Sequence, residues 1–204
     1  MCNDAGLDQV HGAIDGCTKC APFAGPTYAK IIGLRRGSLA PIVVIGQGPA
    51  AKESAEKRAF AGAAGTVLDR WLVASGADPT NPRERVYLTS LLKCGCRAAG
   101  HVYWRMVENC EPFLVRQISV IRPSLVITLG KAAYDWIRED ARPYASAACS
   151  RFTVGDNPLL SRFPFGIDVL AWPHPSPANN AMLRRSDIRQ RMVESFAVVR
   201  QHLH

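Results

Sequence analysis

Four short apolar runs are the feature that most constrains the fold of this chain. Each has the length of a buried strand, and they cover 42–46, 86–91, 125–129 and 167–172. Helical periodicity marks other segments, namely 66–75, 107–121, 131–137 and 187–203. Strands that alternate with helices are typical of a three-layer α/β/α fold around a mainly parallel sheet. We therefore expect one domain, 1–204, with a central four-stranded sheet.

The remaining segments show no sustained period. A short helix is expected within 1–16, and a charged loop follows the first strand around Glu53. Glycine and proline predict loops over 17–40 and 97–104. No clear period is visible over 141–164.

Composition limits the class of protein. With 204 residues, of which 48% are hydrophobic, the chain is long enough to bury a sizeable core. No apolar run is long enough to span a membrane, and residues 1–16 lack the pattern of a signal peptide, so we expect a cytoplasmic protein. The net charge of +8 and the pI of about 9.4 suit a polyanionic partner such as nucleic acid. A surface that is basic simply by composition explains the charge equally well.

Seven cysteines in a cytosolic chain favour metal or redox chemistry over disulfides. Cys17 and Cys20 form a CxxC pair, and Cys94, Cys96 and Cys110 make up a second group. Four such thiolates can hold zinc or an iron–sulfur cluster, and the spacing alone leaves both open. We expect the other two, Cys2 and Cys149, to pack as small apolar groups.

Polar loops follow three of the expected strands. One runs over 46–60 and holds two glycines and a proline, the second is Thr89-Ser90, and the third, 173–185, presents His174 between two prolines. Open α/β sheets bind ligands at the carboxyl ends of their strands. We therefore expect these loops to converge on one pocket.

Several of these segments resemble motifs of one known family. They read, in order, VVIGQGPA with AFAGAAG, VYLTSLLKC, ENCEPFL, SLVITLGKAAY and HPSP. Together, with the cysteines interleaved, they resemble the uracil-DNA glycosylase superfamily, and most closely its family-4 members, which carry an iron–sulfur cluster. The resemblance covers roughly Cys17 to Arg185.

The resemblance implies a DNA-repair enzyme that hydrolyses the N-glycosidic bond of uracil in DNA. His174 would donate to the base oxygen, backbone NH groups of Gln47 and Gly48 would hold the base, and Phe60 would stack on it after it is flipped out. Glu53 would position water and stabilise the cationic sugar.

The family's cluster positions coincide with four of the cysteines. A structural 4Fe–4S cluster would be held by Cys17, Cys20, Cys94 and Cys110. Cys96 has no counterpart in the family, although it is placed to substitute for Cys94.

Two positions depart from the family pattern. Gln47 stands where the family usually has glutamate, which shifts the work of a carboxylate to Glu53. Relatives that crosslink to DNA need that glutamate and a basic insertion, so we expect turnover instead of a trapped adduct. Ser90 stands where asparagine is usual, and its shorter hydroxyl predicts relaxed choice among deaminated bases, including xanthine and hypoxanthine.

The resemblance also implies contacts with DNA, and we expect the protein to be a monomer. The DNA contacts would come from the loop after His174, through Ser176, through Met182 or Leu183 as an apolar wedge, and through Arg184 and Arg185 on phosphates. Two other functions remain open. One is a non-catalytic iron–sulfur nucleic-acid-binding module of the same fold, and the other is an α/β protein that binds small nucleotides.

Overall fold

A computed structural model describes residues 4–23, 40–95, 99–155, 163 and 165–203. Its elements follow in chain order: α1 (Asp4–Asp15), β1 (Ile42–Gly46), α2 (Ala51–Glu56), α3 (Ala63–Ala74), β2 (Val86–Ser90), α4 (Gly100–Ile121), β3 (Leu125–Leu129), α5 (Lys131–Ile137), α6 (Tyr144–Ala147), β4 (Arg151–Val154), β5 (Ile167–Trp172), η2 (Pro177–Asn179), α7 (Asn180–Arg184) and α8 (Ser186–Leu203).

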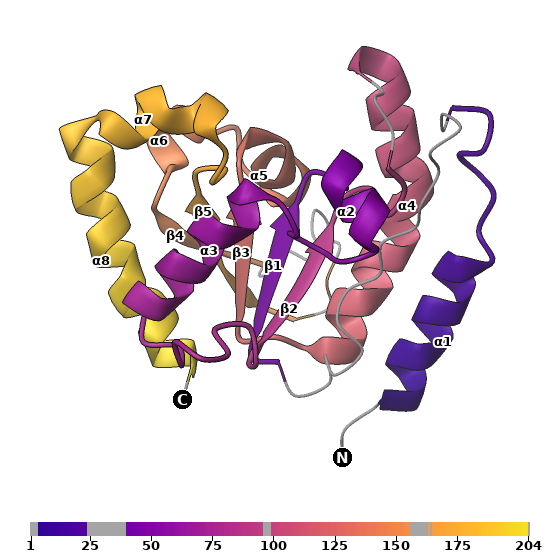
Figure 1. Ribbon diagram of the computed structural model, residues 1–204, viewed down its shortest axis with the longest axis horizontal. Helices are drawn as coiled ribbons and strands as arrows, with labels where there is room; N and C mark the ends of the chain where they lie inside the picture. The colour runs from indigo at the N-terminus through magenta and orange to yellow at the C-terminus, as the bar shows by residue number, and fades with distance from the viewer. Residues whose placement is uncertain (1–3, 24–39, 96–98, 156–162, 164, 204) are drawn as a thin grey trace.

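The sheet lies at the centre of the molecule (Figure 1). Over the described ranges it has five strands in the order β2-β1-β3-β5-β4, so the prediction of four strands was one short. β2, β1, β3 and β5 run parallel, as expected, and β4 is antiparallel to β5 at the edge. The missed strand, β4, has only four residues, and exposed residues alternate along it with more buried ones. It therefore adds no continuous apolar run to the sequence.

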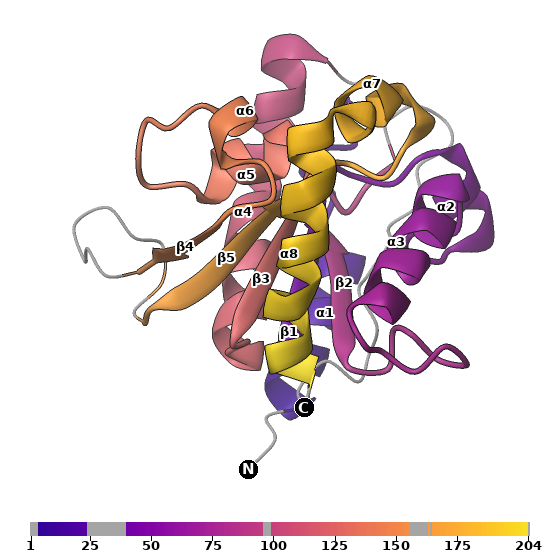
Figure 2. The ribbon, with the colours of Figure 1, turned by 90° about the vertical axis from the view of Figure 1, so that its left-hand side faces the viewer.

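Helices cover both faces of the sheet (Figures 1 and 2). Val43 and Ile45 of β1 point into a core shared with α1, α4 and α5. Ile42 and Val44, which alternate with them, pack in a second core beneath α3 and α8. A strand buried on both faces reads as a continuous apolar run, which is why the sequence located β1 correctly. The three-layer α/β/α architecture is confirmed.

Three stretches differ from the sequence prediction. α4 begins at Gly100, so 100–104, expected as loop, is helical. The charged loop after β1 contains the short helix α2, and 141–164 contains α6 as well as β4. In α4 the inward face continues through Tyr103 and Met106, which are buried, but the glycine at the start of the helix masked that pattern. Of the loop expected over 17–40, residues 24–39 lie outside the described residues.

A chain of buried polar groups ties three elements together. Tyr87 of β2 bonds through its hydroxyl to His11 Nε2 of α1 (2.8 Å) and accepts from Gln117 Nε2 of α4 (2.7 Å). Thr89 Oγ1 donates to Gln117 Oε1 at 3.0 Å and accepts from Lys93 Nζ at 2.7 Å. Buried polar groups are costly unless they are paired, so this chain fixes the carboxyl end of β2 against two helices.

Among the helices that the structure describes, none is long and apolar enough to cross a membrane.

Candidate active site

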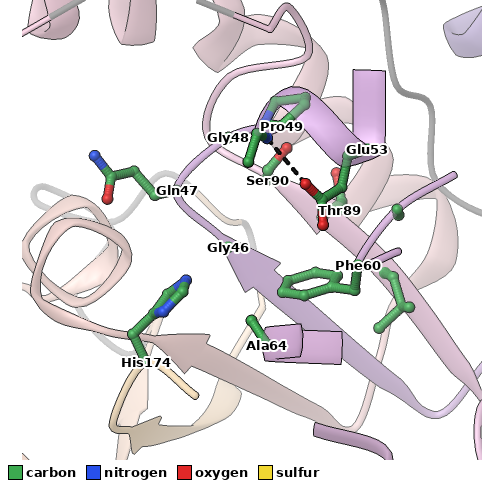
Figure 3. Close-up of a pocket in the computed structure, with 13 residues that line it drawn as sticks. Gly46, Gln47, Gly48, Pro49, Glu53, Phe60, Ala64, Thr89, Ser90 and His174 are labelled. Atoms are coloured by element: carbon green, nitrogen blue, oxygen red, sulfur yellow. Dashed lines mark hydrogen bonds between the residues drawn. The ribbon is translucent and has the colours of Figure 1, made fainter. Parts of the chain in front are cut away.

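The loops after β1, β2 and β5 meet at one edge of the sheet, as the sequence predicts, and enclose a pocket with a volume of about 100 Å³ (Figure 3). The residues around it come from the end of β1 and the segment after it, from the end of β2, from the start of α3 and from the turn after β5: Gly46, Gln47, Gly48, Pro49, Ala50, Glu53, Ala59, Phe60, Ala64, Leu88, Thr89, Ser90 and His174. Thr89 and Ser90, expected as a loop, are the last residues of β2. Six predicted site residues therefore share one cavity, namely Gln47, Gly48, Glu53, Phe60, Ser90 and His174.

The ring of Phe60 forms one wall of the pocket and lies against Gly46 (Figure 3). A Cβ added at Gly46 would lie 2.8 Å from Phe60 Cζ, so only glycine allows this approach. Phe60 itself has a φ of +51°, a left-handed conformation that is uncommon for a bulky residue. Such strain persists only where the surroundings enforce it.

Arg83 enforces the conformation of Phe60. Its Nη1 and Nη2 donate to the carbonyl oxygens of Ala59 (3.1 Å) and Phe60 (3.0 Å). The same guanidinium makes a two-pronged pair with Asp69 of α3, at 2.6 and 3.0 Å. Arg83 is not among the residues predicted from the sequence, because nothing in a proline-rich loop signals a partner far along the chain. A Cβ at Gly65 would lie 1.9 Å from the Phe60 carbonyl oxygen, so the α3 backbone closes this contact from the other side.

Glu53 bridges two loops of the pocket. Its Oε2 accepts from the Ala50 amide at the start of α2 (3.2 Å), and its Oε1 accepts from the Gly62 amide at the start of α3 (2.9 Å). The carboxylate therefore has a structural task in addition to the role predicted for it. A carboxylate has about four acceptor positions, so two bonds leave capacity for a further donor.

His174 is half-buried on the opposite side of the pocket from Phe60 (Figure 3). Its turn is held by Asn179, whose Nδ2 donates to the His174 carbonyl oxygen at 3.0 Å. Burial lowers the pKa of His174 below its usual 6.5, and the negative charge of Glu53 acts in the opposite direction. The imidazole is therefore neutral at neutral pH, with one donor and one acceptor nitrogen.

Ser90 and Gln47 differ in how they face the pocket. The Ser90 hydroxyl donates to the Leu92 carbonyl oxygen at 2.5 Å, so its proton is committed and its lone pairs remain. Gln47 is exposed, and its side-chain amide points away from the ring of Phe60 (Figure 3). The backbone carbonyl oxygen of Gln47 accepts from the Leu92 backbone amide at 3.2 Å, and this bond joins the segments after β1 and β2.

A model of the uracil DNA glycosylase superfamily matches residues 36–197, which hold all three loops of the pocket. The chain belongs to the uracil DNA glycosylase superfamily. Its curated relatives include the type-4 uracil-DNA glycosylase of Archaeoglobus fulgidus, 34% identical over 132 residues, which are 64% of this chain and 63% of the relative. The corresponding protein of Saccharolobus solfataricus is 28% identical over 97% of this chain and 86% of the relative. That of Thermotoga maritima is 30% identical over 62% and 63%.

The relatives support the family-4 resemblance that the motifs predicted. The match to the Archaeoglobus protein spans less than two thirds of that relative's length. The superfamily assignment itself rests on most of the chain, because the family model extends from just before β1 into α8.

The four cysteines predicted as cluster ligands do not line the pocket. Cys17 is half-buried, whereas Cys20, Cys94 and Cys110 are buried. Asn109 Nδ2 contacts Cys20 Sγ at 3.6 Å, which brings the CxxC segment against α4 next to Cys110. Burial lowers the pKa of Lys93 to about 7, while charge on Cys110 and Cys94 acts in the opposite direction.

The positions of the possible ligand side chains bear on which metal centre the protein can hold. Among the described residues, no three Cys, His, Asp or Glu side chains lie close enough to hold one ion. Cysteine thiolates can be ligands of either zinc or an iron–sulfur cluster, so the donor type alone leaves both open. Cys96 and Cys2 lie outside the described residues. Cys149 is buried against Met192 at 3.8 Å, as predicted for a packed thiol.

The segment after His174, expected as a loop, is mostly helical, because η2 and α7 occupy 177–184. Met182 packs against the core under α3 and α8, while Leu183 is half-buried. Arg184 is exposed, and Arg185 pairs with Asp187 at 3.1 and 2.9 Å. Ser176 lies in a neighbouring hollow beside His174. Of the two wedge candidates, Leu183 is the one whose side chain is not part of that core.

The electrostatic coupling of His174 and Glu53 can be measured directly. We expect the ring protons of His174, followed by NMR, to titrate with a midpoint below 6.5, because burial disfavours the charged ring. In Glu53→Gln the midpoint should move lower still, since the carboxylate that favours protonation is gone. His202, whose pKa is lowered by burial and by the charge of Arg151 against the opposing effect of Asp168, should not move. A His174 midpoint above 6.5, or one unchanged by the substitution, would contradict this assignment.

Proposed function

We propose that the protein is a DNA glycosylase that hydrolyses the bond between deoxyribose and uracil and leaves an abasic site. One observation carries the proposal, namely a stacking ring, a neutral imidazole and a carboxylate that face a single cavity: Phe60, His174 and Glu53. The names of the type-4 relatives support the choice of uracil and DNA. The net charge of +8 suits a DNA substrate.

The departing base carries negative charge, and His174 is suited to stabilise it. A hydrogen-bond donor aimed at the base oxygen lowers the barrier most when it is fixed before the reaction. Asn179 holds the histidine backbone in place. The ring is neutral because burial lowers its pKa, so it offers one N–H to the developing anion.

The sugar becomes cationic as the base leaves, and Glu53 supplies the balancing charge. Its two backbone bonds fix the carboxylate between α2 and α3, and its remaining acceptor capacity suits a water molecule. Gln47 is an amide and cannot act as a base, which leaves Glu53 as the carboxylate of the pocket.

Phe60 and Ser90 would select the base. A base inside a stacked duplex is out of reach, so the nucleotide must be flipped into the pocket, where the Phe60 ring provides a stacking surface. Because the Ser90 hydroxyl proton is engaged with Leu92, the oxygen acts as an acceptor toward the base. Uracil, hypoxanthine and xanthine all present a ring N–H beside a carbonyl, so we include all three as substrates.

We further propose that Cys17, Cys20, Cys94 and Cys110 hold a 4Fe–4S cluster. It would act structurally, by tying the segment after α1 to the end of β2 and to α4. The burial of three of these thiols supports the assignment, as does the approach of Cys20 to Asn109.

For the DNA, we propose that Leu183 fills the space left by the flipped nucleotide and that Arg184 contacts phosphate. Met182 is half-buried and packed against the core, so it is less free to enter a duplex. Arg185 would exchange its bond to Asp187 for a phosphate.

One observation favours a different function. Gln47 removes the carboxylate that the family usually has in its first motif, and loss of turnover would leave a cluster-containing module that binds nucleic acid. A cleavage assay separates the two, because such a module would bind uracil-containing DNA without cleaving it.

Incubation with uracil-containing oligonucleotides, followed by alkali, should produce strand breaks at uracil. In His174→Ala the rate should fall by about 100- to 1000-fold, the usual cost of removing a preorganised donor to a developing anion. Binding without any strand break in the wild-type protein would support the non-catalytic module, and absence of DNA binding at low salt would leave a protein that binds small nucleotides.

The same assay on oligonucleotides with hypoxanthine or xanthine tests base selection. Strand breaks at these bases are expected for the wild-type protein, and Ser90→Asn should narrow the spectrum toward uracil. A spectrum that is the same in both proteins would refute a selecting role for Ser90.

Leu183→Ala separates a wedge from a purely structural residue. We expect a loss of about tenfold in cleavage of duplex DNA, since unstacking a base pair costs a few kcal/mol, and little change on single strands, which need no wedge. An equal loss on both substrates would count against the wedge.

The cluster predicts a brown protein with roughly four iron and four sulfide per chain. Cys110→Ala should lose most of this iron. Cys149→Ala is a matched control, because it removes another buried thiol in the opposite core, and it should keep the iron. A colourless, iron-free wild-type protein would exclude the cluster.

A further inference from the structure

A second hollow opens beside the pocket and is larger, with a volume of about 500 Å³. Gln47 and His174 line both hollows, so the two lie next to each other at these residues. The lining of the second hollow also includes Trp104 of α4, Lys131 at the start of α5, and Tyr144 of α6. None of these three has a task in the chemistry described above.

Trp104 stands out because it is an exposed aromatic residue. Its side chain is 41% exposed, although indole rings are usually mostly buried. Tyr103 meets it edge to face, with ring centroids 5.3 Å apart, and this contact limits the orientations of the indole. The other large exposed apolar residues of the described chain are Val73 and Val193, and neither borders the two hollows.

The charges around the hollow favour an uncharged ligand. Lys131 is paired with Asp135, which also pairs with Arg138 at 3.3 Å. Lys131 and Asp135 both border the hollow, so their charges largely offset each other there. An isolated phosphate would find little unpaired positive charge, whereas a planar base could stack on the partly exposed indole of Trp104.

We propose that this hollow binds the nucleobase next to the flipped one, stacked on Trp104, when the DNA strand is unpaired. The inference rests on the proposed function only for the position of the excised nucleotide. Because the hollow adjoins the first pocket at His174, a nucleotide next to the flipped one, tethered to it by one phosphodiester, would lie beside the hollow. Base–aromatic stacking is tolerant of sequence, so the site recognises a base without selecting which one.

Binding of short single-stranded oligonucleotides tests the proposal. Each carries a central 2′-fluoro-deoxyuridine, which resists cleavage, and a normal nucleotide or an abasic spacer on its 5′ or 3′ side. For the wild-type protein, removal of the base on one side should weaken binding about tenfold, within the range for one stacked base. Removal on the other side should have little effect.

Trp104→Ala should bind the complete oligonucleotide about tenfold more weakly and should no longer respond to the spacer. Trp104→Phe, which keeps a ring, should retain most of the response, and Val193→Ala, an exposed apolar control on α8, should behave as wild type. A wild-type protein indifferent to both spacers, or a Trp104→Ala protein that still responds, overturns the inference.

These outcomes are independent of catalysis. A response to the spacer that depends on Trp104, in a protein that does not excise uracil, would support the stacking site and reject the glycosylase. Excision of uracil by a protein whose binding does not respond to the spacer would support the glycosylase and reject the stacking site.

Discussion

The parallel pairing of β1 with β2 is the constraint on which the site depends. Its register sets Gly46 opposite Ser90, so both strands end together and their loops emerge side by side. The amides of Leu91 and Leu92 then bond to the carbonyl oxygens of Gly46 and Gln47, which extends the pairing past the sheet. The floor of the pocket is therefore a continuation of the sheet, and it shares the rigidity of the core.

The chain of buried hydrogen bonds at the end of β2 also holds the pocket in place. Lys93 reaches back to Thr89 Oγ1 and to the Ser90 carbonyl oxygen. Gln117 holds Thr89 from the side of α4. A buried polar group is costly unless it is hydrogen-bonded, so these bonds of the buried Lys93 amine favour this one conformation at the end of β2. It also links the pocket physically to the segment that carries Cys94.

The sequence was sufficient for features that follow from local pattern. Continuous apolar runs located the parallel strands, and the rule that ligands bind at strand ends correctly predicted that Phe60 and His174 share a pocket. The features that it did not reveal depend on distant pairing. The clamp of Arg83 on Phe60 needs Asp69 to lie beside it, and Glu53 shows its second bond only when α3 lies next to α2. β4 pairs on one edge only, so it carries too weak a pattern to detect.

The crowding around Phe60 has an evolutionary consequence. A methyl group at Gly46 or Gly65 would collide with the ring or the carbonyl of Phe60, so drift cannot reshape that wall one residue at a time. Gln47 and Ser90, which also line the pocket, already carry side chains, so substitutions there do not meet this steric limit. New substrate preferences in this lineage should therefore arise at these two positions, while the aromatic wall stays unchanged.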